Sequence, residues 1–400
     1  MLDSLDLADG LRLAVVARDD GLAALPQVRQ SDGSWRRASP GDGAAEALLA
    51  LMNDTASTTR RGRFTVHAWS PPAAVGERAV TVDQTNESVI VGDTAVVKWA
   101  THLQEGPHPA PRRLEVLRTN GFHFMPTTWG LITWSPDGAA ETLVVNVDEY
   151  LPGAVDGWTW AVDLVADAVR NGTPGPVLSA AAEVGTVVAE LHSALAGTAG
   201  TAAVADADRW RDAAFATLKD ARALASSALR EVLDAHLGEV EQTLAALGGL
   251  AGCPVIEGHG DLHVGQVLRC AGRFVVTDFD GNPVLPPQQR VLPIPAVLDV
   301  ASMAQSLAHV AIVARRHNDL DTAALAVLDD AARQAFLDAY AHHLAALGHA
   351  DLYDPAPLRA FRLLQVLREV VYAAKYLPRW MYVPDAALPA LLDERTPGEP

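Results

Sequence analysis

A ten-residue segment in the second half of the chain constrains the fold most strongly. It reads HGDLHVGQVL, residues 259–268, and RFVVTDFDG follows it at residues 273–281. Both segments combine short strand-like apolar runs with tight-turn residues, between stretches of helical periodicity. Three interpretations of the first segment compete: a metal cluster, a catalytic loop, or a turn between two strands.

The metal-cluster interpretation is the weakest of the three. His259 and His263 are possible zinc ligands, but no third ligand follows at a suitable spacing. The chain has two cysteines, Cys253 and Cys270, which indicate neither a zinc site nor a disulfide framework. These histidines are therefore not expected to hold a metal ion.

The secondary-structure pattern divides the chain into three predicted parts. Residues 1–80 contain short strands and one helix, which is typical of a small α+β unit. Residues 81–150 begin with two β-rich runs around Gly92-Asp93, a hairpin signature, followed by a short helix and more strands. Residues 151–400 are mostly helical, apart from the strands that flank the two loops described above.

The charged residues of these parts match the requirements of phosphoryl transfer from ATP. Lys98 ends an apolar strand, and Glu115 lies on the next helix, where it could hold that lysine. Asp261 is followed five positions later by Gln266, the spacing between the catalytic Asp and the metal-binding Asn in protein kinases. Asp278 follows the next apolar strand, where a second metal ligand is expected.

Each of these residues also has a simpler interpretation. Lys98 could be a solvated lysine at a strand end, and Asp278 could be a turn residue before Gly281. Glu115 is the weakest member of the set, because the neighbouring arginines of its helix could pair with it on the surface. The four elements in kinase order favour the catalytic interpretation.

The charge of the chain limits its partners. Lys plus Arg is 31 and Asp plus Glu is 49, which gives a net charge of −18. Such a surface disfavours nucleic acid and anionic membranes as general partners. The N-terminus lacks a signal-peptide pattern and no run of about 18 apolar residues appears. We expect a cytoplasmic monomer with no membrane span.

With these motifs, the chain resembles the aminoglycoside-phosphotransferase-like kinases, and among them most closely the actinobacterial maltokinase group. That group reads HGD-aromatic-H-x-GQVL, then DFEGEP, and has a segment similar to DQTNESVIVGDTAVVKW, residues 83–99 here. It lacks a glycine-rich phosphate loop. The resemblance implies an α+β, eukaryotic-protein-kinase-like bilobal fold, with an N-terminal cap, a β-rich intermediate subdomain and a helical C-lobe.

The resemblance also implies residue roles, with ATP and Mg²⁺ as cofactors. Asp261 would orient or deprotonate the acceptor hydroxyl, and Gln266 and Asp278 would hold Mg²⁺. Lys98, steadied by Glu115, would contact the phosphates. The remaining nucleotide contacts would come from Ser88, just before a strand, and from the interlobe linker around Asn146, Asp148 and Tyr150.

The C-terminal part departs from the maltokinases. Where their pattern is Tyr-Glu-x-x-Arg, this chain reads Tyr372-Ala373-Ala374-Lys375-Tyr376, and DFEGEP is DFDGNP, with Asp280. Gln365, Glu369, Tyr372 and Tyr376 share one face of a predicted helix, ahead of Trp380. A solvated face is the simpler interpretation, but the aromatic residues favour a wall for a sugar, because apolar sugar faces pack on aromatic rings.

These departures favour an amino sugar as the acceptor, as in the related actinobacterial glucosamine kinases. A sugar ammonium needs carboxylates, for which Asp280, Asp299 and Glu369 are the candidates beside Asp261. Asp299 could equally cap a helix and brace the catalytic loop. The other candidate substrate residues are His263, Tyr372, Lys375 and Trp380. We expect an ATP-dependent glucosamine kinase that forms glucosamine 6-phosphate.

Three alternatives remain at this stage. A maltokinase would phosphorylate the anomeric hydroxyl of maltose, and an aminoglycoside phosphotransferase would accept a larger cationic substrate. A nucleotide-binding module without catalysis is disfavoured by the intact set of Lys98, Asp261, Gln266 and Asp278.

Overall fold

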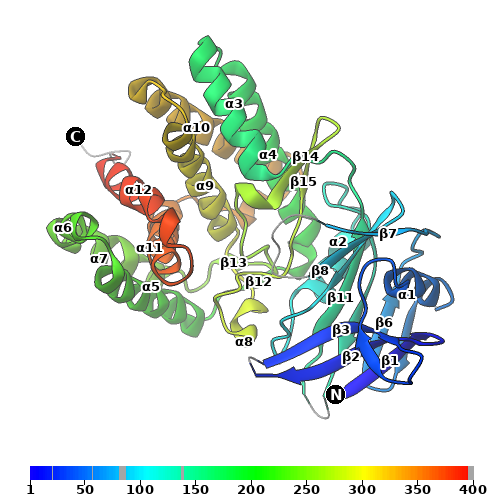
Figure 1. The fold of residues 1–400 in the computed structure, drawn as a ribbon. Coiled ribbons are helices and arrows are strands. Elements are labelled where there is room, and N and C mark those ends of the chain that lie inside the picture. The colour runs from blue at the N-terminus through cyan, green and yellow to red at the C-terminus, as the bar shows by residue number, and fades with distance from the viewer. Residues whose placement is uncertain (20, 56, 81–86, 137–138, 395–400) are drawn as a thin grey trace. The chain divides into compact units, whose positions relative to one another are not determined.

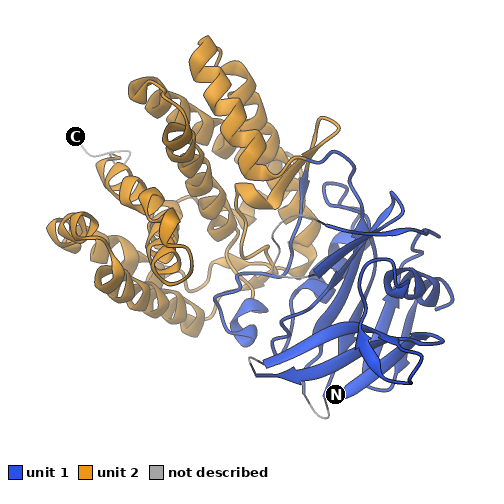
Figure 2. Ribbon diagram, viewed as in Figure 1, with its two compact units in different colours: residues 1–154, 275–292 blue, residues 155–274, 293–400 orange. Residues whose placement is uncertain are grey.

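The computed structural model describes residues 1–19, 21–55, 57–80, 87–136 and 139–394. These residues form two compact units (Figure 2). Unit 1 comprises residues 1–154 and 275–292, and unit 2 comprises residues 155–274 and 293–400. The sequence placed residues 275–292 in the C-lobe, but the structure assigns this segment to unit 1.

Unit 1 contains a four-stranded antiparallel sheet at its N-terminus, which packs against one helix (Figure 1). Its strands are β1 (Asp3–Ala8), β2 (Leu11–Arg18), β3 (Gly21–Arg29) and β4 (Trp35–Arg37) in sequential order. The helix is α1 (Ala44–Asn53), which confirms the helix predicted there. Leu5, Leu13 and Leu48 are buried in a shared core, as alternating strands and an amphipathic helix require.

A seven-stranded sheet forms the rest of unit 1, in the order β5-β6-β10-β11-β9-β8-β7. Its strands are β5 (Thr58–Arg61), β6 (Phe64–Ala68), β7 (Glu77–Ala79), β8 (Glu87–Val91), β9 (Ala95–Trp99), β10 (Thr128–Trp134) and β11 (Thr142–Glu149). Since β6 pairs with β10, the sheet joins strands from both sides of the predicted boundary at residue 80. That boundary therefore divides one sheet, because long-range strand pairing leaves no signal in local periodicity.

The predicted hairpin and helix of residues 81–150 are confirmed where the structure describes them. β8 and β9 pair antiparallel around Gly92, whose φ of 58° is the left-handed conformation that a tight turn requires. Helix α2 (Ala110–Thr119) ends just before Gly121. Residues 83–86 of the segment that resembles the maltokinases lie outside the described residues.

Unit 2 is mostly helical (Figure 1). Its main helices are α3 (Gly157–Asn171), α4 (Gly175–Leu195), α5 (Val204–Leu224), α6 (Ser227–Ala235), α7 (Leu237–Ala245), α9 (Ala296–His317), α10 (Thr322–Ala346), α11 (Leu358–Tyr376) and α12 (Tyr382–Asp393). β12 (Gly200–Thr201) pairs with β13 (Pro254–Val255), and β14 (Val267–Cys270) pairs with β15 (Arg273–Val276). The predicted return of strands around the two loops is thus confirmed.

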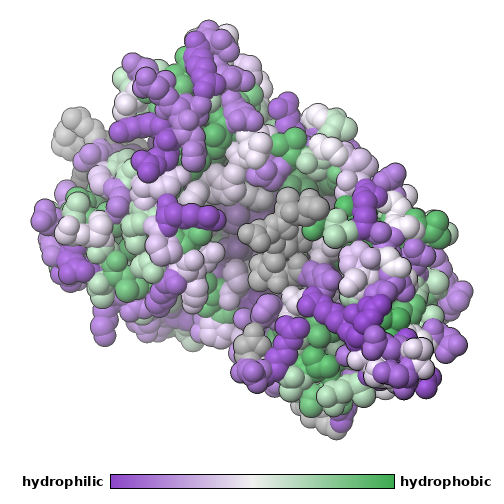
Figure 3. All heavy atoms as spheres, in the orientation of Figure 1, coloured by the Kyte–Doolittle hydropathy of each residue, from purple (hydrophilic) through white to green (hydrophobic). Residues whose placement is uncertain are grey.

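Helix α9 is long and apolar enough to cross a membrane by the measures of length and composition alone. However, 78% of its apolar window is buried inside the protein, as in the core helix of a folded domain. On the face drawn in Figure 3, hydrophilic residues cover much of the surface, and the hydrophobic residues between them are scattered.

The packing of α4 against α10 depends on a glycine, which gives a first prediction. A Cβ atom at Gly185 would lie 2.4 Å from the carbonyl oxygen of Phe336 in α10. We expect Gly185→Ala to lower the free energy of unfolding by about 1–3 kcal/mol, because the two helix backbones would have to move apart. Chemical denaturation would measure the loss.

Gly238→Ala in α7 is the matched control, because a Cβ atom there meets no other atom within 4 Å. It should be neutral or stabilise the protein by up to about 1 kcal/mol. Equal effects of the two substitutions would contradict the packing role of Gly185.

Candidate active site

Strand alternation places three of the predicted nucleotide residues on one face of the large sheet. Lys98 of β9 lies opposite Ser88 of β8 and opposite Asn146 of β11 in the strand register. Because side chains directly opposite one another share a face, these three side chains line the same surface. Ser88 lies within β8 and is buried, rather than just before the strand as predicted.

The structure gives Lys98 a different partner from the predicted one. Its Nζ lies 3.1 Å from Oδ2 of Asp148, which also accepts a hydrogen bond of 2.7 Å from Asn146. Burial lowers the pKa of Lys98, but the charges of Asp148 and then Asp278 outweigh it, so the net pKa is raised. Glu115 is exposed and lies 3.8 Å from Arg112, because α2 turns Leu114 and Leu117 inward instead.

The predicted linker residues Asn146 and Asp148 belong to a strand. Both lie in β11, whose backbone pairs with β9 on one side and β10 on the other. Their backbone groups are therefore engaged in the sheet and cannot serve as the adenine-binding linker. Tyr150 follows the strand: its N–H donates to Thr94 O at 2.8 Å, and the Arg78 guanidinium lies 5.0 Å from its ring centroid.

The DFDG segment of unit 1 brings two further carboxylates towards Lys98. Asp278 is exposed and has a φ of 66°, a strained conformation for a residue other than glycine. The pKa of Asp280 is raised to about 7, first by burial and then by the charge of Asp278, while Lys98 opposes the shift. Arg113 holds this segment by donating to the carbonyl oxygen of Phe279 at 3.0 Å.

This group of charges fits a divalent cation bound together with phosphate. Among the described residues there is no group of three or more His, Cys, Asp or Glu side chains arranged as a metal site. Mg²⁺ is usually held by one or two carboxylates together with substrate phosphates and water, so a larger group is not required. A cation beside Asp278 would also relieve the repulsion that raises the pKa of Asp280.

In unit 2, a buried carboxylate holds the HGD loop. Asp299 of α9 is fully buried and accepts hydrogen bonds from the amides of His259 at 2.7 Å and Gly260 at 2.8 Å. Burial alone would raise the pKa of Asp299, but the hydrogen bond and charge of His192 lower it. Of the two interpretations of Asp299, the structure supports the brace, because a fully buried side chain with these partners cannot contact a sugar.

Inside the loop, His263 also has a bracing position. Its Nδ1 accepts from the amide of Gly265 at 3.1 Å, and its Nε2 lies 3.4 Å from Nε2 of Gln266. The amide of Asp261 lies 3.3 Å from Nδ1 of His259, which sets the turn that presents the Asp261 carboxylate. A Cβ atom at Gly157, where α3 begins, would lie 1.7 Å from the carbonyl oxygen of Val264, so only glycine fits there.

Helix α11 carries the polar stripe predicted for the acceptor. Gln365 and Glu369 are partly buried, and the Gln365 amide donates to Oε1 of Glu369 at 3.3 Å. Arg368 of the same helix was not predicted as a site residue. Burial lowers the pKa of Arg368, and the charge of Asp261 opposes this shift. Its spacing from Gln365 and Tyr372, three and four positions, was the signal that could have identified it.

The aromatic residues of the acceptor prediction fall into two groups. Tyr372 and Tyr376 are exposed, with ring centroids 5.5 Å apart, and Lys375 is exposed between them. Trp380 packs edge-on against Trp158 of α3, with centroids 5.2 Å apart. Trp158 was not predicted from the sequence, because no local pattern links the start of α3 to the segment after α11.

Comparisons with known proteins show which proteins the chain is similar to. No family model matches the chain. A glucosamine kinase from Mycolicibacterium smegmatis is 62% identical over 396 residues, 99% of this chain and 99% of the relative. A glucosamine kinase from Streptacidiphilus jiangxiensis is 45% identical over 98% of this chain and 91% of its own length.

A solved structure shares the fold over almost the whole chain. It is described as glucosamine kinase in complex with glucosamine, ADP and inorganic phosphate. The TM-score is 0.87 at 42% identity, with coverage of 98% of this chain and 93% of the other. This similarity confirms the predicted kinase-like α+β fold class.

The raised pKa of Asp280 predicts a pH-dependent cost to folding. Because the native pKa of about 7 exceeds the ordinary 3.8, the folded state binds the proton more tightly than the unfolded state. The stability contribution of Asp280 therefore falls as pH rises between these values. Without nucleotide or divalent cation, Asp280→Asn should stabilise the protein by about 1–2 kcal/mol at pH 8.

Denaturant unfolding at pH 8 and pH 5 would measure this effect, and the gain should shrink at the lower pH. Asp9→Asn, at an exposed position of unit 1, is the control and should show no pH-dependent gain. An equal gain for Asp280→Asn at both pH values would contradict the electrostatic origin.

Proposed function

Because the chain belongs to the glucosamine kinase family, we propose that it transfers the γ-phosphoryl group of ATP to D-glucosamine and forms D-glucosamine 6-phosphate. The observation that carries this proposal is the 62% identity to a glucosamine kinase over 99% of both chains. The loop held by Asp299 and the charged group around Lys98 supply the chemistry that the reaction requires. Neither a maltokinase nor an aminoglycoside kinase has comparable support.

The proposed reaction assigns one role to each charged group. Asp261 accepts the proton of the 6-hydroxyl as that oxygen attacks the γ-phosphorus, and the bond to the β-phosphate oxygen breaks. Lys98, held by Asp148, balances charge on the phosphates. Gln266 and Asp278 would hold Mg²⁺, which neutralises phosphate charge when bound. Asp280 adds negative charge beside Asp278 in unit 1, and we propose it as a further residue that binds a cation.

The proposed acceptor site lies on unit 2. Glu369 carries the carboxylate for the sugar ammonium, and Arg368 and Asp261 lie within electrostatic reach of one another. Tyr372, Lys375 and Trp380 are proposed as the surrounding wall, where aromatic rings pack on apolar sugar faces. His263 acts by bracing the catalytic loop. The monomeric state and the cytoplasmic location stay predictions.

The function is tested by ATP consumption with a panel of acceptors: glucosamine, glucose, N-acetylglucosamine, maltose and one aminoglycoside. We expect strong turnover with glucosamine, weak turnover with glucose and none with maltose, because maltose offers only hydroxyl groups. NMR of the product should place the phosphate on the 6-hydroxyl. Preferred turnover of maltose, or phosphate at the anomeric carbon, would overturn the proposal.

The role of Asp261 is tested separately. Asp261→Asn should lower kcat by about 10²–10⁴-fold, because the amide cannot accept the hydroxyl proton. The Kd for ATP, measured by calorimetry, should remain largely unchanged. Asp163→Asn, at an exposed position of α3, is the control and should retain full turnover. Loss of ATP binding in Asp261→Asn would contradict the assigned role.

A further inference from the structure

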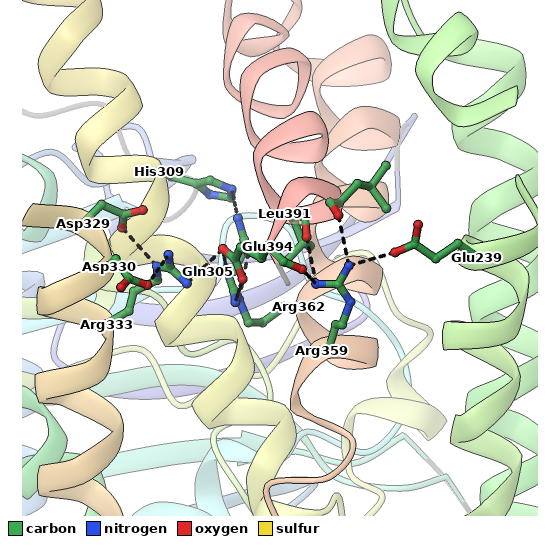
Figure 4. A network of polar contacts seen from close by, with 11 residues as sticks. Glu239, Gln305, His309, Asp329, Asp330, Arg333, Arg359, Arg362, Leu391 and Glu394 are labelled. Carbon is green, nitrogen blue, oxygen red and sulfur yellow. Dashed lines mark hydrogen bonds and ion pairs between the residues drawn. The ribbon is translucent and has the colours of Figure 1, made fainter. Parts of the chain in front are cut away.

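Figure 4 shows a polar network in unit 2 that includes His309, Gln305, Arg362 and Glu394. A further contact of His309, with Glu369, extends this network. His309 of α9 is 1% exposed, and its Nδ1 lies 3.2 Å from Oε1 of Glu369. Its other ring nitrogen, Nε2, lies 3.0 Å from Nε2 of Gln305, which is also 1% exposed. Oε1 of Gln305 accepts a hydrogen bond of 3.1 Å from Nε of Arg362.

These contacts determine the tautomer of His309. A guanidinium only donates hydrogen bonds, so the group of Gln305 that faces Arg362 must be its carbonyl oxygen. The NH₂ group of Gln305 therefore faces His309 and donates to Nε2. Because Nε2 must then accept, the hydrogen of the neutral ring is on Nδ1, from which it is donated to Glu369.

The far end of the network is anchored at the end of α12. Arg362 donates to both carboxylate oxygens of Glu394, at 2.6 and 2.9 Å. Glu394 also lies 3.0 Å from Nη1 of Arg333, whose Nε is 3.2 Å from Asp329. Bidentate ion pairs of this kind hold both partners in one geometry, so Arg362 is fixed in place. If the amide of Gln305 rotated, its oxygen would lose the buried hydrogen bond from Nε of Arg362.

The network provides hydrogen-bond donors for only one of the two carboxylate oxygens of Glu369 among the residues that the structure describes. Oε1 accepts from His309 and from Gln365. Oε2 is buried and has no hydrogen-bond partner among the residues that the structure describes. A buried carboxylate oxygen without a donor is costly, which is consistent with a donor that arrives with a ligand.

We propose that His309, fixed in the Nδ1–H tautomer by Gln305, is a positioning residue that orients Glu369 so that Oε2 receives the ammonium group of the acceptor sugar. This proposal rests on the proposed function. Because Nε2 accepts from Gln305, the ring carries one hydrogen and is neutral. No positive charge of His309 then competes with the sugar ammonium for Glu369. His309 thereby acts on discrimination between amino and neutral sugars rather than on the transfer step.

The direct test reverses the polarity of the network with Gln305→Glu. The new carboxylate would accept from Arg362 and from Nε2–H of His309, so the ring would carry two hydrogens and a positive charge beside Glu369. We expect KM for glucosamine to rise about tenfold or more, since the cation competes with the ammonium. KM for glucose, which has no ammonium, and kcat should change little.

A pair of substitutions at His309 tests the same role without a new charge. The side-chain amide of Asn can occupy the position of Nδ1, so His309→Asn should keep KM for glucosamine close to that of the unmodified enzyme. His309→Leu offers no donor and should raise KM for glucosamine without changing KM for glucose. His343→Asn is the control, because His343 forms a similar 2.7 Å pair with Glu190 at a more exposed position.

The tautomer itself is read from the ¹⁵N shifts of the His309 ring in the full-length protein. A hydrogen on Nδ1 is expected, and a hydrogen on Nε2 would overturn the proposal. Thermal unfolding would first show that Gln305→Glu is folded. If the unmodified enzyme turns over glucosamine and this variant keeps the same ratio of kcat/KM for glucosamine to kcat/KM for glucose, the positioning role of His309 is overturned and the proposed function stands. Absence of glucosamine turnover in the unmodified enzyme would instead overturn the proposed function.

Discussion

The buried carboxylate of Asp299 is the interaction on which the catalytic half of the molecule depends. It accepts hydrogen bonds from two successive amides of the HGD loop and is itself held by His192. A carboxylate with full burial is tolerated only because each of these donors compensates for its lost hydration. The position of the loop on α9 therefore follows from one side chain that has no contact with substrate in the proposed reaction.

In unit 1, by contrast with the compensated carboxylate of Asp299, the negative charges around Lys98 are not fully compensated. Three carboxylates, Asp148, Asp278 and Asp280, act on Lys98, so that negative charge is in excess around this lysine. The pKa of Asp280 is raised to about 7, first by burial and then by the charge of Asp278. Such an imbalance costs stability in the isolated protein and becomes favourable when a divalent cation is bound. Function and folding stability thus make opposing demands on the same residues, as is common at ligand sites.

Predictions of local elements were confirmed more often than predictions of which residues contact one another. The hairpin at Gly92, the helices α1 and α2 and the kinase-like fold class are confirmed. The partner of Lys98 was wrong, because a strand neighbour, Asp148, lies nearer than a helix residue. Asn146 and Asp148 were assigned to a linker, but they lie in β11, since a polar residue every second position is also typical of a strand.

The sequence by itself determined the local chemistry: which segments form strands or helices, and which segments carry the lysine, the carboxylates and the amide that phosphoryl transfer needs. These features depend on residue order over fewer than about twenty positions, the range over which periodicity and turn residues act. Only the tertiary structure decided the partners of those residues. Arg362 of α11 donates to Gln305 of α9, which in turn contacts His309 of the same helix. His309 then contacts Glu369, which lies again on α11. Such contacts between separate helices arise from packing, which local sequence patterns do not specify.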